Sequence, residues 1–112
     1  MEVVGIDIHV HLNDEKASAA SGARGEQMAR YFGQQRKLVS ADELADQYRA
    51  RNMMAVLMNS TDITTSGIQP VPNDHIAEAV RRNPDVLIGF GIVEPQMGKL
   101  AKDEIRRCAE EL

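Results

Sequence analysis

The sequence predicts an α/β protein in which three strands of a parallel sheet alternate with helices. Three short segments, at residues 5–12, 53–58 and 86–93, have the apolar content and length of strands. Helical patterns follow them at residues 41–51, 73–82 and from 98 onward. Such alternation is typical of a parallel sheet packed against its connecting helices, so we expect three βα units in one domain.

Composition narrows the possible partners. The chain has 112 residues, enough for one small domain, and its 43% hydrophobic content can supply a core. Its formal charge of -4 argues against a nucleic acid or an anionic membrane, which would require a basic patch. A single cysteine, no signal-like start and no long apolar run favour a cytoplasmic protein that acts on a small molecule.

The first strand segment, residues 5–12, carries polar residues that a buried strand rarely contains. Strict alternation would place Asp7, His9 and His11 on one face, and Ile6, Ile8, Val10 and Leu12 on the other. Imidazoles two residues apart can converge on one metal ion, so His9 and His11 are candidate ligands. The alternative is a half-exposed strand with ordinary polar residues on its wet side.

Residues 13–39 form a polar insertion rich in alanine, serine and glycine. Residues 18–23 have too little apolar bulk to bury, whereas residues 26–32 can form a short helix. A long loop in a compact domain is usually a lid or a disordered segment. We favour a loop that covers a substrate over a simple linker.

The second unit begins with a helix over residues 41–51. Ser40 and Glu43 have the spacing of a capping box, and Leu44, Ala45 and Tyr48 fall on the face expected to meet the sheet. After the strand at 53–58, Asn59 and Ser60 stand where a substrate contact is possible, although these residue types also favour ordinary turns.

In the third unit we expect Asn73 to cap a helix ending at Arg82. His75, in the first turn, is expected to be a neutral surface or packing residue, because the positive end of a helix disfavours an imidazolium. The strand at 86–93 places Gly89 and Gly91 on one face, where small residues would leave open space on the inner side of the sheet. Glu94 at its end either orients a substrate or hydrogen-bonds the loop.

The final helix is amphipathic. Ala101, Ile105, Cys108 and Leu112 follow a helical spacing, and Cys108 is expected to be a packed small hydrophobe and not a nucleophile. Gly89 and Gly91 do not form a dinucleotide-binding fingerprint, because Glu94 stands where a third glycine is needed.

The run Ile-Asp-Ile-His-Val-His-Leu at residues 6–12 resembles the first-strand metal motif of the amidohydrolase superfamily. The segments 73–78, 83–85 and 87–95 are similar, in order, to the second helix and third strand of the amidohydrolase-related hydrolases and decarboxylases. The resemblance covers the chain apart from residues 13–39. It implies the first three βα units of a (β/α)₈ barrel.

The resemblance implies a divalent metal, preferably zinc, bound by His9 and His11, with Asp7 holding an imidazole N–H. The reaction would be hydrolysis or non-oxidative decarboxylation of a small carboxylic acid, lactone or amide-like compound. Family members take further histidine and aspartate ligands from later strands, which lie beyond residue 112. We therefore expect the chain alone to be inactive and to self-associate or dock onto the rest of a barrel.

Alternatives to this function remain open at this stage. TatD-type deoxyribonucleases also begin with an Asp-x-His-x-His strand, but the acidic charge and the Gly-Phe-Gly-Ile-Val-Glu-Pro segment speak against them. A non-catalytic α/β module, or a half-barrel that needs a partner, fits the length. Asp7, instead of holding an imidazole N–H, could be a buried carboxylate bonded to a neighbouring strand.

Overall fold

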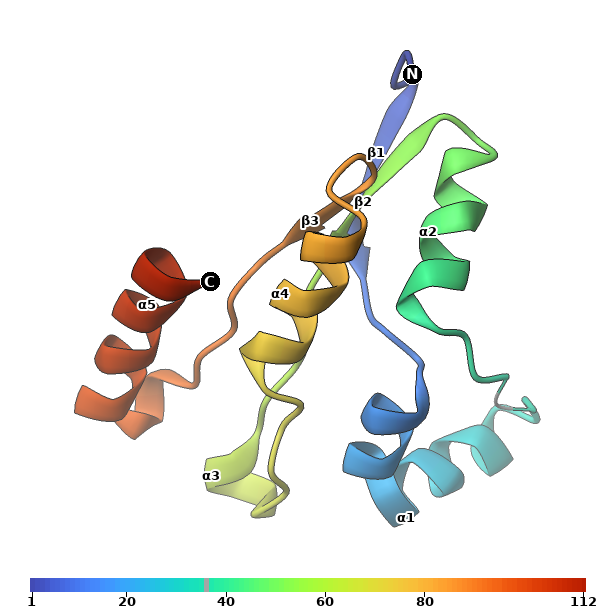
Figure 1. The fold of residues 1–112 in the computed structure, drawn as a ribbon. Coiled ribbons are helices and arrows are strands. Elements are labelled where there is room, and N and C mark those ends of the chain that lie inside the picture. Colours follow the sequence, from blue (N-terminus) through green and yellow to red (C-terminus); the bar gives the residue numbers. More distant parts are fainter. Residues whose placement is uncertain (36) are drawn as a thin grey trace.

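The structure, a computed structural model that describes residues 1–35 and 37–112, is a mixed α/β fold with a three-stranded parallel sheet. Its elements are β1 (Gly5–Val10), α1 (Glu15–Tyr31), α2 (Ala41–Arg49), β2 (Met53–Leu57), α3 (Ile63–Ser66), α4 (Asn73–Arg82), β3 (Leu87–Gly89), the short 3-10 helix η1 (Pro95–Met97) and α5 (Lys99–Glu111). The strand order is β1-β2-β3. All three carboxyl ends point towards the side of the molecule where α1 and α3 lie (Figure 1).

A bulge in β1 changes which side chains face the helices. Asp7 pairs with Ala55 and Val10 pairs with Leu57, so three steps along β1 match two along β2. Ala55 and Leu57 are fully buried, and the pairing puts Asp7 and Val10 on their face of the sheet, whereas Ile8 is 73% exposed. The predicted faces are therefore wrong for Ile6, Asp7 and Ile8, because strict alternation fails between Asp7 and Val10, where a residue is inserted.

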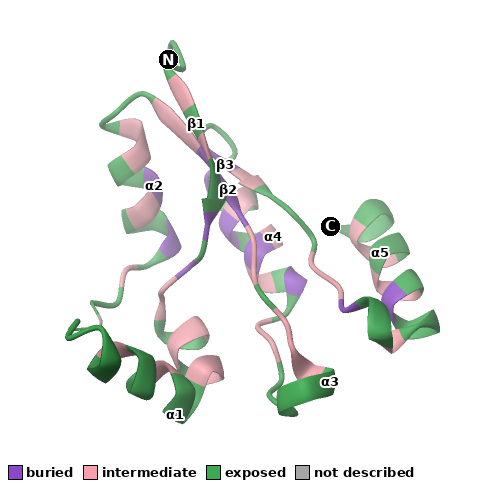
Figure 2. Ribbon diagram, turned by 180° about the vertical axis from the view of Figure 1, so that it is seen from behind, coloured by how far each residue is buried: buried purple, intermediate pink, exposed green. Residues whose placement is uncertain are grey.

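The core lies between the sheet and the helices α2 and α4. Figure 2 shows buried positions on β2 and α4, and largely exposed ones on α1. The predicted capping box of α2 is confirmed, because Ser40 and Glu43 each accept the other's backbone N–H. Leu44 and Tyr48 pack against the core as expected. The buried residues of this core are Val10, Leu12, Ala41, Ala45, Ala55, Leu57, Ile76, Ala79, Val86 and Leu87.

Charged contacts join α2 to the end of α4. The Arg49 guanidinium donates to both carboxylate oxygens of Asp85 and to the side-chain oxygen of Asn83. Asn83, which is buried, donates in turn to the Asp42 carboxylate of α2. These bonds fix the two helices side by side on one face of the sheet.

Within the described residues, no helix lies over the other face of the sheet (Figure 2). Ile6, predicted to pack beneath helices, is 50% exposed on this side. The molecule is flat, with extents of 41 × 40 × 19 Å and a radius of gyration of 15.0 Å. A compact domain of this length has a radius of about 13 Å. The described residues thus form a layer with one uncovered side.

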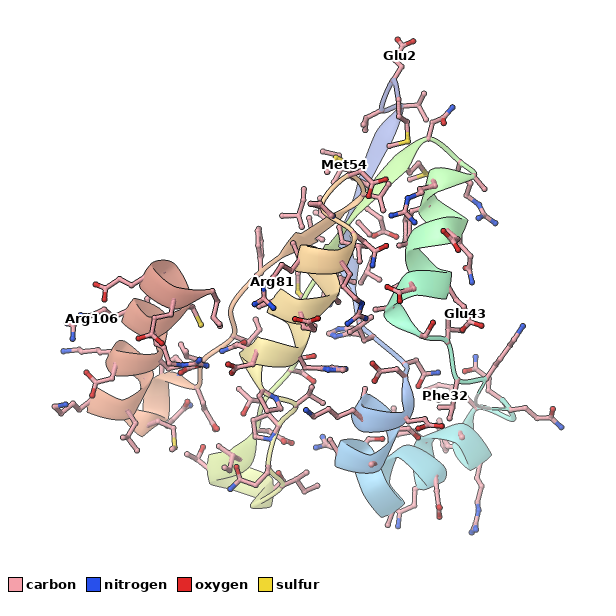
Figure 3. All side chains as sticks on the ribbon, in the orientation of Figure 1. Glu2, Phe32, Glu43, Met54, Arg81 and Arg106 are labelled. Atoms are coloured by element: carbon pink, nitrogen blue, oxygen red, sulfur yellow. The ribbon has the colours of Figure 1, made fainter. Side chains whose placement is uncertain are left out.

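Residues 15–31 form a helix that includes most of the short helix expected at residues 26–32 and extends into the part expected to be irregular. Asp14 caps α1 by accepting the backbone N–H of Ala17, and alanine favours helix even where nothing is buried. No residue of α1 is buried, and Gly22 interrupts the helix with φ 46° and ψ -139°. Figure 3 labels Phe32 just beyond its end. Arg36, inside the predicted insertion, lies outside the described residues.

β3 is shorter than predicted because a side chain takes over its pairing. The strand ends at Gly89, and the backbone N–H and C=O of Ile92 instead bond the side chain of Asn73. Asn73 is therefore not the predicted cap of α4, whose N-cap is Pro72. The amide of Asn73 also donates to Glu104 of α5, and so joins three segments.

The two glycines of the third strand segment face helices, not an open interior as predicted. A Cβ on Gly89 would lie 3.2 Å from Ile76 and Val80 of α4, and one on Gly91 would lie 3.1 Å from the Cys108 sulfur of α5. The helices approach closely here because no side chain intervenes.

The apolar stripe of α5 is only partly buried. Ala101 is covered, but Ile105 is 56% exposed, because the extended segment after β3 carries α5 away from the sheet (Figure 1). Along the described chain, no helix has both the length and the apolar character required to cross a membrane.

Candidate metal and substrate site

The two histidines predicted as metal ligands converge at the carboxyl end of β1. The Nε2 atoms of His9 and His11 lie 2.9 Å apart, and their ring centroids are 4.9 Å apart. Both side chains are exposed. The bulge lies between Asp7 and Val10 and includes His9, so that Val10 points into the core while the imidazoles stay outside it.

A backbone carbonyl fixes the tautomer of His11. Nδ1 of His11 lies 3.0 Å from the carbonyl oxygen of Met58, which can only accept, so Nδ1 carries the hydrogen. Nε2 of the neutral ring is then left with its lone pair, and Nε2–H of His9 donates to it. Hydrogen bonding of this kind on the far nitrogen is the usual support of a metal-binding histidine.

The spacing of the pair fits part of a metal site. Nitrogens at 2.0–2.1 Å from one ion lie about 2.9 Å apart at a right angle and about 3.3 Å apart at a tetrahedral angle. The observed 2.9 Å matches the lower value. No cluster of three or more His, Cys, Asp or Glu suited to a metal occurs in residues 1–35 and 37–112. Among the described residues, His9 and His11 therefore form a pair with no third group of this kind beside them.

Asp7 does not hold an imidazole N–H as predicted. Its carboxylate accepts the Tyr48 hydroxyl at 2.8 Å and the backbone N–H of His9 at 3.3 Å. Asp7 faces α2, so its hydrogen bonds hold the bulge and the helix and do not reach the imidazole rings. Burial and the bond to Asp7 raise the pKa of Tyr48 to about 12.

A cavity of about 600 Å³ lies beside His11. α1 forms one wall, and the chain that follows β2 forms the other, including Asn59 and Ser60. Asn59 donates its amide to the carbonyl of Val71, at the far end of the same loop. The structure thus brings His11, Asn59 and Ser60 to one cavity, while His9 does not line it.

Glu94, the third predicted substrate contact, belongs to a neighbouring cavity of about 220 Å³ that Asn59 and Ser60 also line. It is buried, and its carboxylate accepts both the backbone N–H and the hydroxyl of Thr64. Of the two roles considered for Glu94, the loop bond is the one present here. This bond ties α3 to the end of the third strand segment.

His75 and Cys108 make their contacts elsewhere and do not take part in the His9–His11 pair. Nε2 of His75 lies 2.6 Å from the Asp14 carboxylate, which connects the first turn of α4 to the cap of α1. Burial acts to raise the pKa of Asp14, but the Ala17 N–H and His75 outweigh it and hold that pKa below its usual value. Burial and then Glu104 raise the pKa of the half-buried Cys108 thiol, which favours the protonated, unreactive form.

Two components of this region escaped the sequence prediction. The Met58 carbonyl has no side-chain signature, and Arg24 lies in a stretch that showed only alanine, serine and glycine bias. Met58 meets His11 across 47 residues and Arg24 meets Asp62 across 38, so no local pattern could indicate either contact.

No protein-family model, curated protein or solved structure matches the chain. The fold and the site define it as an α/β protein with a histidine pair at the carboxyl end of its first parallel strand.

Proposed function

We propose that His9 and His11 are the first two ligands of the metal site of an amidohydrolase-type hydrolase or non-oxidative decarboxylase. The observation that carries this proposal is the 2.9 Å separation of their Nε2 atoms, beside a cavity of ligand size. The pair stands where parallel strands end, which is where (β/α)₈ barrels build their catalytic sites. In this proposal the sheet forms the first part of such a barrel.

The chain's own groups have defined tasks in this proposal. The Met58 carbonyl holds the Nδ1–H of His11, so the lone pair of its Nε2 can bind a metal once the hydrogen bond from His9 is released. His9 needs its hydrogen on Nδ1 to do the same. The chemistry that a divalent ion, preferably zinc, supplies when bound here is polarisation of a carbonyl or activation of a water. Ser60, whose hydroxyl is exposed at the cavity, can contact a small carboxylic acid, lactone or amide-like substrate.

The flat shape supports the barrel part of the proposal. Ile6 and Ile8 are at least half exposed on the uncovered face of the sheet, where the inside of a barrel would lie. Exposed apolar surface of this kind favours association. Self-association, or docking onto the remainder of a barrel, would cover it.

Zinc titration calorimetry tests the metal site. We expect weak binding of one zinc ion per chain, because two imidazoles provide half of the usual four ligands. His9→Ala and His11→Ala should each abolish it, whereas His75→Gln, a change in the third histidine, should leave it intact. Binding that is unchanged in both single variants would contradict the proposal and favour a non-catalytic module.

Light scattering at several concentrations tests the barrel part separately. We expect the chain to form species larger than its 12.4 kDa monomer as concentration rises. Ile8→Glu should shift the equilibrium towards the monomer, because it places a charge on the uncovered face. A wild-type chain that remains a folded monomer throughout would contradict this part and leave the zinc result standing.

A further inference from the structure

The cavity beside His11 contains one opposite pair of charges. Among the described residues that line it, Arg24 is the one arginine or lysine and Asp62 is the one carboxylate. Arg24 stands on α1, two residues after the interruption at Gly22, and Asp62 precedes α3. The two side chains form an ion pair across the cavity.

This ion pair can open at little cost. The Arg24 side chain is 60% exposed and that of Asp62 is 40% exposed, and ion pairs between exposed side chains contribute little net stability. Asp62 also has a second partner, because the Ser66 hydroxyl donates to its carboxylate at 2.9 Å. Release of Arg24 therefore leaves Asp62 hydrogen-bonded.

Arginine matches the geometry of a carboxylate better than any other side chain, since its guanidinium can donate two parallel hydrogen bonds. The bond to Arg24 and then that to Ser66 hold the pKa of Asp62 below its usual value, so Asp62 stays ionised at neutral pH. The Asp62 carboxylate thus takes the position on the Arg24 guanidinium that the carboxylate of a bound ligand would take.

We propose that Arg24 is a specificity-determining residue that binds the carboxylate of a small substrate in this cavity by displacing Asp62. This inference rests on the proposed function for where the reaction occurs, on the His11 side of the same cavity. Among carboxylic acids, lactones and amides, it selects the acid, because the other two cannot neutralise a guanidinium. The volume of about 600 Å³ is within the range of small-molecule sites.

Calorimetry or NMR titration in metal-free buffer, with benzoate and the neutral benzamide as probes, tests the proposal. We expect benzoate to bind more tightly than benzamide to the wild-type chain. Arg24→Gln should weaken the affinity for benzoate by about tenfold, roughly the loss of one charged contact, and should leave the affinity for benzamide unchanged. Arg30→Gln removes the same charge from the exposed part of α1 outside the cavity, and should change neither.

Asp62→Asn provides a test in the opposite direction. With its competitor removed, Arg24 should bind benzoate more tightly than in the wild type. A purely structural ion pair predicts no gain from Asp62→Asn, and that result would overturn the proposal even if Arg24→Gln unfolded α1. Equal binding of benzoate and benzamide to the wild type would also overturn it. Zinc binding by His9 and His11, measured separately, tells whether the proposed function fails as well.

Discussion

The helices α1 and α2 both follow β1, yet they have different relations to the rest of the molecule. α2 has 9 residues and buries Ala41 and Ala45 against the sheet. α1 has 17 residues and buries none. It is held at Asp14 by His75 and at Arg24 by Asp62, through side chains instead of packing. The comparison separates a scaffold helix, stabilised by apolar burial, from a helix at the site that polar contacts position.

The largest expected effect concerns the core under α2. Leu57 is fully buried in the central strand, so Leu57→Ala should lower the free energy of unfolding by about 2–5 kcal/mol. Met28→Ala, on an exposed side chain of α1, should change it by no more than about 0.5 kcal/mol. Urea denaturation measures both, and similar losses would show that α1 belongs to the core.

A smaller effect is expected at the bond between α2 and β1. Tyr48→Phe leaves the Asp7 carboxylate without its hydroxyl donor and should lower the free energy of unfolding by about 1–3 kcal/mol. Because burial and Asp7 raise the pKa of Tyr48 above the ordinary 10.0, its contribution is complete below pH 10.0 and is lost as pH rises to about 12.

Ultraviolet titration of tyrosinate in a Tyr31→Phe background isolates Tyr48, since the chain has two tyrosines. Ionisation at the ordinary 10.0 would show that the hydroxyl is not held by Asp7 in solution.

Removal of the N-terminal caps of α1 and α2 should have different effects on global stability. Ser40→Ala removes one half of the capping box of α2 and should cost about 1 kcal/mol of global stability. Asp14→Ala removes the cap of α1 and its bond to His75, and should reduce helical circular dichroism with little change in the urea midpoint. If Ser40→Ala and Asp14→Ala lowered global stability equally, the distinction between the two helices would be wrong.

The smallest effect is the acid response of α1. The pKa of Asp14 lies below its ordinary 3.8, so its stabilisation is present above that pH and is lost as pH falls through the lowered value. NMR signals of α1 should therefore move towards random-coil positions in acid before those of the core strands. Asp14→Asn, which cannot ionise, should abolish this separate transition, and its persistence would assign it to another group.

Local chemistry was sufficient to predict the strongest elements. The capping box of Ser40 and Glu43 and the apolar spacing of Leu44, Ala45 and Tyr48 predicted α2, because these interactions span only a turn or two. The central strand was predicted within one residue for the same reason. The histidine pair could also be selected from sequence, since its partners stand two residues apart.

What the amino-acid sequence determined by itself was therefore the α/β alternation, the helix cap and the choice of His9 and His11 as a pair. Only the tertiary structure decided that Asp7 faces α2, that Asn73 pairs with Ile92 in place of a strand, and that Arg24 meets Asp62. These contacts join residues 19 to 41 positions apart, and the bulge that reorients Asp7 arises from the register with β2. Periodicity describes one segment at a time, whereas register and long-range hydrogen bonds depend on where a second segment lies.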